Sequence, residues 1–192
     1  MTIRNTILRA ATPVSRAIGK LHFSPSHRMF KAEHYDKLLN KIELGDVILS
    51  RMKGEFNNLF IPGYWTHAAI FIGVNQVVEA VDPRIVCTHL MDFCFSKDDI
   101  TLMRYKEIDF EMRKKIRENA LNLIGKPYDF QFCPANDAFF CSELVAHVLN
   151  ISGIKQEFAK RETLGVLTVT PQDFAEAQTK FTQVYYSFNP IP

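Results

Sequence analysis

Apolar residues recur along the chain with two different spacings, and each spacing predicts one type of element. Strand-like runs lie at 47–50, 67–72, 77–81, 100–105 and 182–188. Helical spacing occurs at 33–41, 109–124 and 141–151, and Thr170-Pro171-Gln172-Asp173 predicts the start of a further helix. The stretch 154–170 is ambiguous. Together these elements predict an α+β fold, a small antiparallel sheet packed against helices on one side.

The central strands are predicted to form a hairpin. A Pro-Gly turn at Pro62-Gly63 precedes an apolar run and puts His67 at the start of a strand. A tight turn at 73–76 then leads into a strand in which Glu79 is the only charged residue. A three-residue turn puts Glu79 on the same face as His67 and near it, whereas a two-residue turn puts them on opposite faces. The alternative is a solvated Glu79 on a half-exposed strand.

Cys141 opens the helix predicted at 141–151. The N–H groups and positive dipole of a helix N-terminus stabilise a thiolate, so Cys141 is a candidate nucleophile. Such a thiol needs a base, and His67 suits this role because a histidine at the mouth of a strand can project past the sheet. His147 lies on a different face of the helix from Cys141. The alternative is an inert, buried cysteine, which is common in proteins.

Five short motifs follow one another in an order typical of a known superfamily. They are Gly45-Asp46-Val47-Ile48-Leu49, Thr66-His67-Ala68-Ala69-Ile70, Val78-Glu79-Ala80, Gly125-Lys126-Pro127-Tyr128-Asp129 and Phe140-Cys141-Ser142-Glu143-Leu144. In this order the chain resembles the circularly permuted branch of the NlpC-type papain-like superfamily, and within it the YiiX-like proteins. The histidine precedes the cysteine, which is the permuted order.

The resemblance implies a cysteine hydrolase of amide bonds. Cys141 would attack a carbonyl, His67 would move the proton, and Glu79 would orient the imidazole. Its substrate would be an amide- or ester-containing small molecule, peptide or lipid, with peptidoglycan-type and N-acyl amides included. Residues expected near the substrate are Tyr128, which resembles a tyrosine beside the nucleophile in these folds, Trp65, Tyr64 and Phe140.

Two other classes of function stay open. The interval from His67 to Glu79 also resembles relatives of lecithin:retinol acyltransferase, in which a second histidine stands where this chain has Glu79. The same thiol could therefore serve a lipid acyltransferase or thioesterase. The third class is a non-catalytic interaction module that kept the fold.

Composition narrows these classes only slightly. A chain of 192 residues that is 47% hydrophobic can bury one sizeable core, so one catalytic domain is expected over 33–192. The four cysteines, at 87, 94, 133 and 141, form no C-x-x-C pair. We therefore expect no metal site, no cofactor and no disulfide framework, but one reactive thiol with three bystanders. This suits a reducing compartment.

Residues 1–32 form a basic, amphipathic arm. Six basic and no acidic residues precede Glu33, and apolar residues recur there at helical spacing. The arm could make peripheral membrane contact through residues 1–22, dock on a partner, pack on the domain as a lid, or serve as an organelle targeting segment. No secretory signal or membrane span is expected, so the location is left open, with a cytoplasmic or membrane-peripheral one favoured. No nucleic-acid binding is expected either. The oligomeric state is left open.

Overall fold

A computed structural model describes residues 30–53, 61–130, 137–158, 161–163 and 166–187. Most of the basic arm, residues 1–29, lies outside the described residues, as does Cys133. Within the described residues no helix is both long enough and apolar enough to cross a membrane. The division of the chain into an arm and a catalytic domain stays a prediction.

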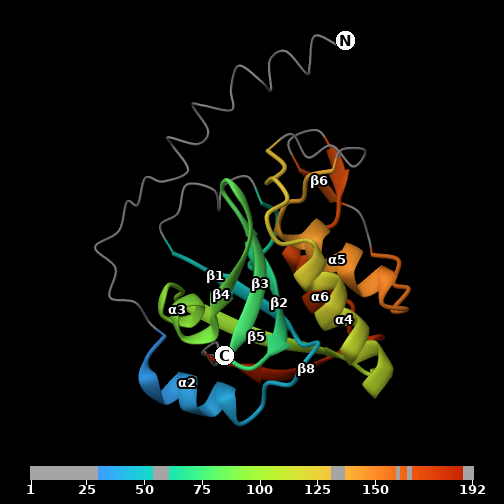
Figure 1. The fold of residues 1–192 in the computed structure, drawn as a ribbon. Helices are drawn as coiled ribbons and strands as arrows, with labels where there is room; N and C mark the ends of the chain where they lie inside the picture. The colour runs from blue at the N-terminus through green and yellow to red at the C-terminus, as the bar shows by residue number, and fades with distance from the viewer. Residues whose placement is uncertain (1–29, 54–60, 131–136, 159–160, 164–165, 188–192) are drawn as a thin grey trace, which may run out of the picture.

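One antiparallel sheet organises the molecule, and its strands are ordered β4-β3-β2-β1-β5-β8 (Figure 1). Its six strands are β1 (Val47–Arg51), β2 (His67–Gly73), β3 (Gln76–Val81), β4 (Arg84–His89), β5 (Asp99–Tyr105) and β8 (Phe181–Tyr186). A separate hairpin pairs β6 (Arg161–Thr163) with β7 (Val166–Thr168). The strands predicted from apolar runs are therefore confirmed, while β4, β6 and β7 add elements that those runs did not indicate.

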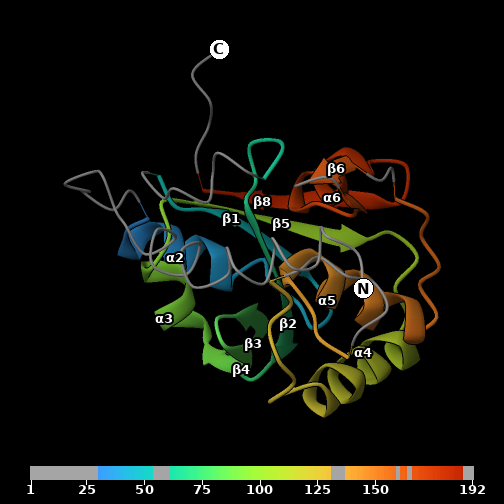
Figure 2. The same cartoon turned by 90° about the horizontal axis from the view of Figure 1, so that it is seen from above.

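Helices cover both faces of the sheet, not one face as the sequence pattern suggested (Figures 1 and 2). The helices are α2 (Ala32–Leu39), α3 (Leu90–Phe95), α4 (Phe110–Asn122), α5 (Cys141–Ile151) and α6 (Pro171–Glu176). The first two pack on one face with residues such as Ile48, and the others pack on the opposite face with residues such as Leu49. The missed helix is α3, which is too short to show helical periodicity.

Burial on both faces explains the continuous apolar runs of the central strands. Successive strand residues point to opposite faces, so a strand covered on both sides is apolar at nearly every position. In β2 the five residues after His67 are all buried, and Ile48 and Leu49 in β1 belong to different cores. His67 is thus the first residue of a strand whose remaining length is anchored from both sides.

The β2–β3 hairpin combines a two-residue turn with a bulge. Val74 and Asn75 form the turn, both with positive φ, and Gly73 pairs with Gln76. The register then shifts between Phe71 and Gly73, so that Ala69 lies opposite Glu79. His67 precedes Ala69 by two residues, and it therefore shares a face with Glu79. The extra bulge residue has the effect on facing that we expected of a three-residue turn.

Candidate active site

Cys141 is the first residue of α5, and the core on one face of the sheet holds this helix in place. Phe140, in an extended conformation, is the N-cap, and its carbonyl accepts the N–H of Leu144 at 2.9 Å. The apolar stripe that predicts the helix is buried beneath it on the sheet: Leu144, Val145, Val148 and Leu149. The first-turn N–H groups of a helix have no acceptor within the helix, so they are available around the sulfur. N–H groups of Ala68 and Ser142 hydrogen-bond to the Cys141 sulfur.

His67 joins the thiol to a carboxylate. Its Nε2 lies 2.9 Å from Oε2 of Glu79, and its side chain also hydrogen-bonds with Cys141. Because Nε2 is occupied by Glu79, Nδ1 is the ring nitrogen left for the sulfur. The imidazole packs against Phe93 of α3, with ring centroids 6.0 Å apart. Residues from two strands and a helix therefore form a continuous thiol–imidazole–carboxylate chain.

Glu79 is buried, at 6% exposure, rather than solvated on a half-exposed strand. Its second oxygen, Oε1, accepts a 2.7 Å hydrogen bond from Oγ1 of Thr88 on the neighbouring strand β4. Both carboxylate oxygens thus have partners, as a buried charge requires. The hydroxyl of Thr88 also fixes the rotation of the carboxylate toward His67.

The three groups shift one another's proton affinities. Burial by itself lowers the pKa of His67, but its hydrogen bonds with Cys141 and Glu79 outweigh burial and raise the pKa to about 9. Burial by itself raises the pKa of Glu79, yet the hydrogen bond and charge of His67 bring that pKa to about 2. The pKa of the Cys141 thiol is lowered despite burial, because His67 and two backbone N–H groups stabilise the thiolate. At neutral pH this arrangement favours a thiolate beside an imidazolium.

The other described thiols lack such surroundings. Cys87 is exposed and Cys94 is buried, and both are free. Burial raises the pKa of Cys87, and burial raises the pKa of Cys94 to about 12. Neither thiol therefore forms a thiolate readily at neutral pH.

Ser142 and Glu143, the two residues after Cys141, have different partners. Ser142 donates its hydroxyl hydrogen to the carbonyl of Val169, at 2.8 Å. The Glu143 carboxylate accepts a hydrogen bond from the N–H of Phe140, the N-cap. Burial, followed by the charge of Asp129, raises the pKa of Glu143 to about 7. Glu143 is therefore a partly protonated carboxyl at neutral pH, close to the start of the helix that carries Cys141.

The proposed substrate contacts fall into two groups. The backbone of Tyr128 bridges to Phe139, two residues before Cys141, and Phe140 is buried at the N-cap. Trp65 and Tyr64 instead lie edge to face with ring centroids 5.0 Å apart, and the hydroxyl of Tyr64 donates to Asp99. A role in substrate contact stays a prediction for all four residues.

Trp65 and Tyr64 border a surface pocket of about 250 Å³ that excludes the three central residues. Its other walls come from β5, β8 and the region of α6: Met103, Gln172, Ala175, Glu176, Gln178, Gln183 and Tyr186. The side chain of Gln172 ties this region to the β2 approach by accepting the N–H of Tyr64 at 3.0 Å. The pocket is therefore beside the strand that carries His67, not around the sulfur.

Sequence reasoning missed three side chains around His67. Thr88 hydrogen-bonds to Glu79, and Phe93 packs on the imidazole. The charge of Lys97 lowers the pKa of both His67 and Glu79. All three follow Glu79 in the segment 82–99, which carries no motif. Only the pairing of β4 with β3 and the turn into α3 bring them to the site. Among the described residues no group of three His, Cys, Asp or Glu side chains is positioned to hold a metal ion.

The chain and its fold are similar to known proteins. A family model for permuted papain-like amidase enzymes, the YaeF/YiiX or C92 family, matches residues 41–186. No curated protein matches the chain. The fold is similar to a crystal structure of the metalloprotein yiiX from Escherichia coli O157:H7, with a TM-score of 0.67 and 20% sequence identity. The similarity covers 76% of this chain and 97% of that one. The expected permuted papain-like α+β fold is confirmed.

Proposed function

Since the chain belongs to the YaeF/YiiX family of permuted papain-like amidases, we propose that it hydrolyses an amide bond with Cys141 as nucleophile, His67 as general acid and base, and Glu79 as the group that orients His67. The family supplies the class of enzyme, a cysteine-type amide hydrolase. The roles of the three residues are our proposal. The proposed substrate is a peptide, a peptidoglycan-type peptide or an N-acyl amide.

The observation that carries the proposal is the uninterrupted contact from sulfur to carboxylate. His67 hydrogen-bonds with Cys141 and lies 2.9 Å from Glu79, which is in turn held by Thr88. A catalytic thiol requires a base within hydrogen-bond reach and a third group that holds that base in orientation. The lowered pKa of Cys141 and the raised pKa of His67 give the required charge states at neutral pH.

Acylation begins with attack of the Cys141 thiolate on the carbonyl carbon of the amide. A sulfur–carbon bond forms and the carbonyl electrons move to oxygen. The backbone N–H of Cys141, at the helix N-terminus, is a candidate donor to that oxyanion. When the tetrahedral intermediate collapses, the carbon–nitrogen bond breaks and the leaving amine takes the proton from His67. The products of this half-reaction are a free amine and a thioester.

Deacylation reverses the proton movement. Neutral His67 takes a proton from water, and the resulting hydroxide attacks the thioester carbonyl. The sulfur–carbon bond then breaks, releasing a carboxylic acid and restoring the thiolate–imidazolium pair. Glu79 stays ionised throughout, because its pKa of about 2 lies far below neutral pH.

The test measures release of primary amine from a panel of peptide and N-acyl amides. We expect Cys141→Ala and His67→Ala each to lower kcat/KM by about 10³-fold or more, because neither residue can perform its role without the other. Glu79→Gln should lower kcat/KM by a smaller factor, because orienting groups contribute less to catalysis than the nucleophile or base. His147→Gln is the matched control, since this histidine lies on the same helix but packs against Phe139.

Other outcomes separate the competing functions. Release of fatty acid from lipid esters, with no cleavage of amides, would favour a lipid acyltransferase or thioesterase that uses the same thiol. Full amidase activity in Cys141→Ala would remove the thiol from the mechanism. An unreactive Cys141 with no turnover of any substrate would favour an interaction module.

A further inference from the structure

Lys97 lies at the side of the proposed catalytic histidine. It follows α3, directly after the C-cap Ser96, and its side chain is half-buried. Its Nζ lies 5.1 Å from the ring centroid of Phe93, and the same ring is 6.0 Å from the imidazole of His67. One aromatic side chain therefore supports both the ammonium group and the imidazole. The sequence gives no motif for this arrangement.

Lys97 makes no ion pair with any described residue, unlike two other lysines of the chain. Lys53 lies 3.2 Å from Asp99, and Lys126 pairs with Asp137. The aromatic face of Phe93 attracts the ammonium group of Lys97, but it does not neutralise the charge. Within the described residues the ammonium group of Lys97 thus lacks a direct ion pair, and a bound anion would offset part of the desolvation cost of this half-buried cation.

The charge of Lys97 also acts on two groups of the proposed site, and it favours the carboxylate of Glu79 by lowering the pKa of that residue. It lowers the pKa of His67 and so works against the imidazolium that the thiolate needs. A residue with only a structural role could be neutral here without that effect. An anion bound beside Lys97 would screen its charge and favour the imidazolium.

We propose that Lys97 binds an anionic group of the substrate, so that the enzyme prefers amides that carry a carboxylate or phosphate near the scissile bond. This inference rests on the proposed function, because it places the anion beside the catalytic histidine. It names a substrate class, anionic N-acyl amides. It also adds a binding residue that the family motifs do not include.

The first experiment measures alkylation of Cys141 and does not depend on turnover. Iodoacetate and iodoacetamide each form a sulfur–carbon bond to Cys141 and release iodide, but only iodoacetate is negatively charged. The readout is the ratio of the two rate constants at pH 7, followed by peptide mass analysis. We expect Lys97→Met to lower the iodoacetate to iodoacetamide ratio at least about threefold, and added salt to shrink this difference.

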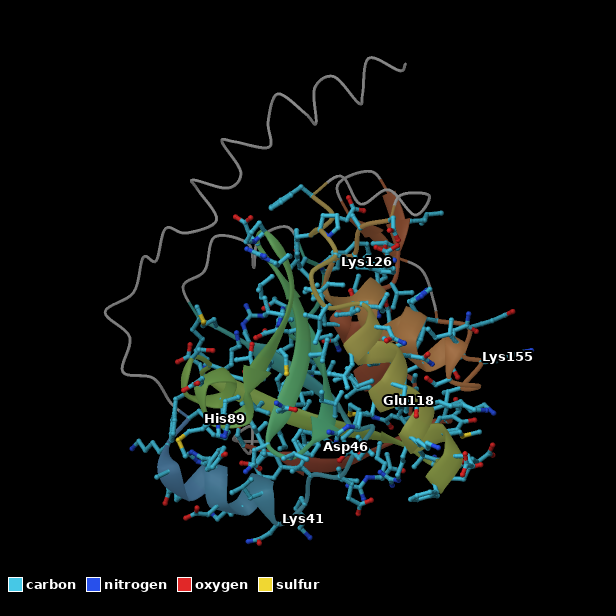
Figure 3. All side chains as sticks on the ribbon, in the orientation of Figure 1. Lys41, Asp46, His89, Glu118, Lys126 and Lys155 are labelled. Carbon is cyan, nitrogen blue, oxygen red and sulfur yellow. The ribbon has the colours of Figure 1, made fainter. Side chains whose placement is uncertain are left out.

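Two further variants control this measurement. Lys97→Arg keeps the positive charge and should restore the ratio. Lys155→Met removes an exposed lysine that lies beyond α4, on the opposite side of the molecule from α3 (Figure 3), and should leave the ratio unchanged. An equal fall in both rate constants in Lys97→Met would mean that the thiolate itself was disturbed, and would overturn a role in anion binding.

The second experiment identifies the anion with two matched substrate pairs. N-acylglycine is compared with N-acylglycinamide, and N-acyl phosphoethanolamine with N-acylethanolamine. The preferred anion should show a kcat/KM advantage of about tenfold over its neutral partner, and Lys97→Met should abolish that advantage mainly through KM. A carboxylate preference alone points to acyl amino acids or peptide ends, and a phosphate preference alone points to lipid-type headgroups.

The two levels of the proposal fail differently. If neutral and anionic amides are cleaved equally, and Lys97→Met changes neither the alkylation ratio nor the ratio of kcat/KM values, the anion site is wrong while the amidase stands. If no amide is cleaved but the alkylation ratio still depends on Lys97, the anion site stands and the reaction class is wrong.

Discussion

At the scale of single residues, the site depends on three groups that control one another's charge. The imidazole of His67 contacts both a thiol and a carboxylate, so that removing either neighbour changes its pKa. The charged form of each partner is stabilised mainly by contact with His67, against the effect of burial. A substitution at any of the three positions therefore alters the proton affinity of the others.

This coupling predicts a bell-shaped dependence of kcat/KM on pH. The rate should rise as pH increases through the lowered pKa of Cys141, because the thiolate forms there. It should fall as pH passes about 9, where His67 loses the proton that the leaving amine needs. A steady rise through pH 10, measured in constant ionic strength buffers, would contradict the assignment of His67 as the acid.

The same coupling predicts selective alkylation of one thiol. Iodoacetamide should modify Cys141 well below the ordinary cysteine pKa of about 8.5. Cys87 and Cys94 should lag, because the pKa of each is raised by burial. In His67→Ala the onset for Cys141 should move to higher pH, while the profile of Cys87 stays unchanged. Equal reactivity of all thiols in the folded protein would refute activation of Cys141.

At the scale of elements, the β2–β3 hairpin decides whether the site exists. Its two-residue turn alone would face Glu79 away from His67, and the bulge between Phe71 and Gly73 reverses that outcome. Both turn residues have positive φ, including Val74 at 52°. A β-branched residue is strained in this conformation, and Val74 is 76% exposed, so it gains little from packing.

Val74→Asn should therefore stabilise the protein. Asn tolerates the left-handed conformation that a two-residue hairpin turn requires, so relief of strain should add about 1 kcal/mol to the free energy of unfolding. Urea unfolding followed by circular dichroism measures the change, and Val74→Ile, which keeps the strain, is the matched control. Amidase activity should be unaffected. A loss of stability in Val74→Asn would show that the turn is not strained.

At the scale of the whole molecule, the covered sheet brings together residues from both of its faces. The helix that carries Cys141 packs on one face, while His67 and Glu79 lie on the face that holds Phe93 and α3. The thiol and the imidazole therefore meet at the end of β2, where the sheet no longer separates the two cores. The contact of the three groups therefore needs both the β2–β3 hairpin and the packing of α5 on the sheet.

The basic arm gives the prediction that belongs to this scale. If the apolar face of the arm is free, its basic residues should each gain about 1 kcal/mol near anionic headgroups. The full chain should then cosediment with phosphatidylglycerol vesicles, and it should do so less at high salt. A chain that begins near Ser24 should not cosediment with these vesicles. Equal, salt-independent partitioning of both chains would instead favour an arm that packs on the domain.

The sequence by itself determined most elements of this protein and its candidate nucleophile. Apolar periodicity is a local property, so most strands and longer helices, and the position of Cys141 at a helix start, could be predicted from neighbouring residues. The pairing of His67 with Glu79 could be stated only as one of two outcomes, because facing depends on how many residues the turn and bulge contain.

Only the tertiary structure decided the surroundings of the imidazole. Thr88, Phe93 and Lys97 reach His67 through strand pairing and a short helix that leave no periodic signal. The helix layer formed by α2 and α3 was equally hidden, since a continuous apolar run in a strand does not say which element covers each face. Contacts of this kind depend on register and on packing between distant segments, and neighbouring residues do not encode them.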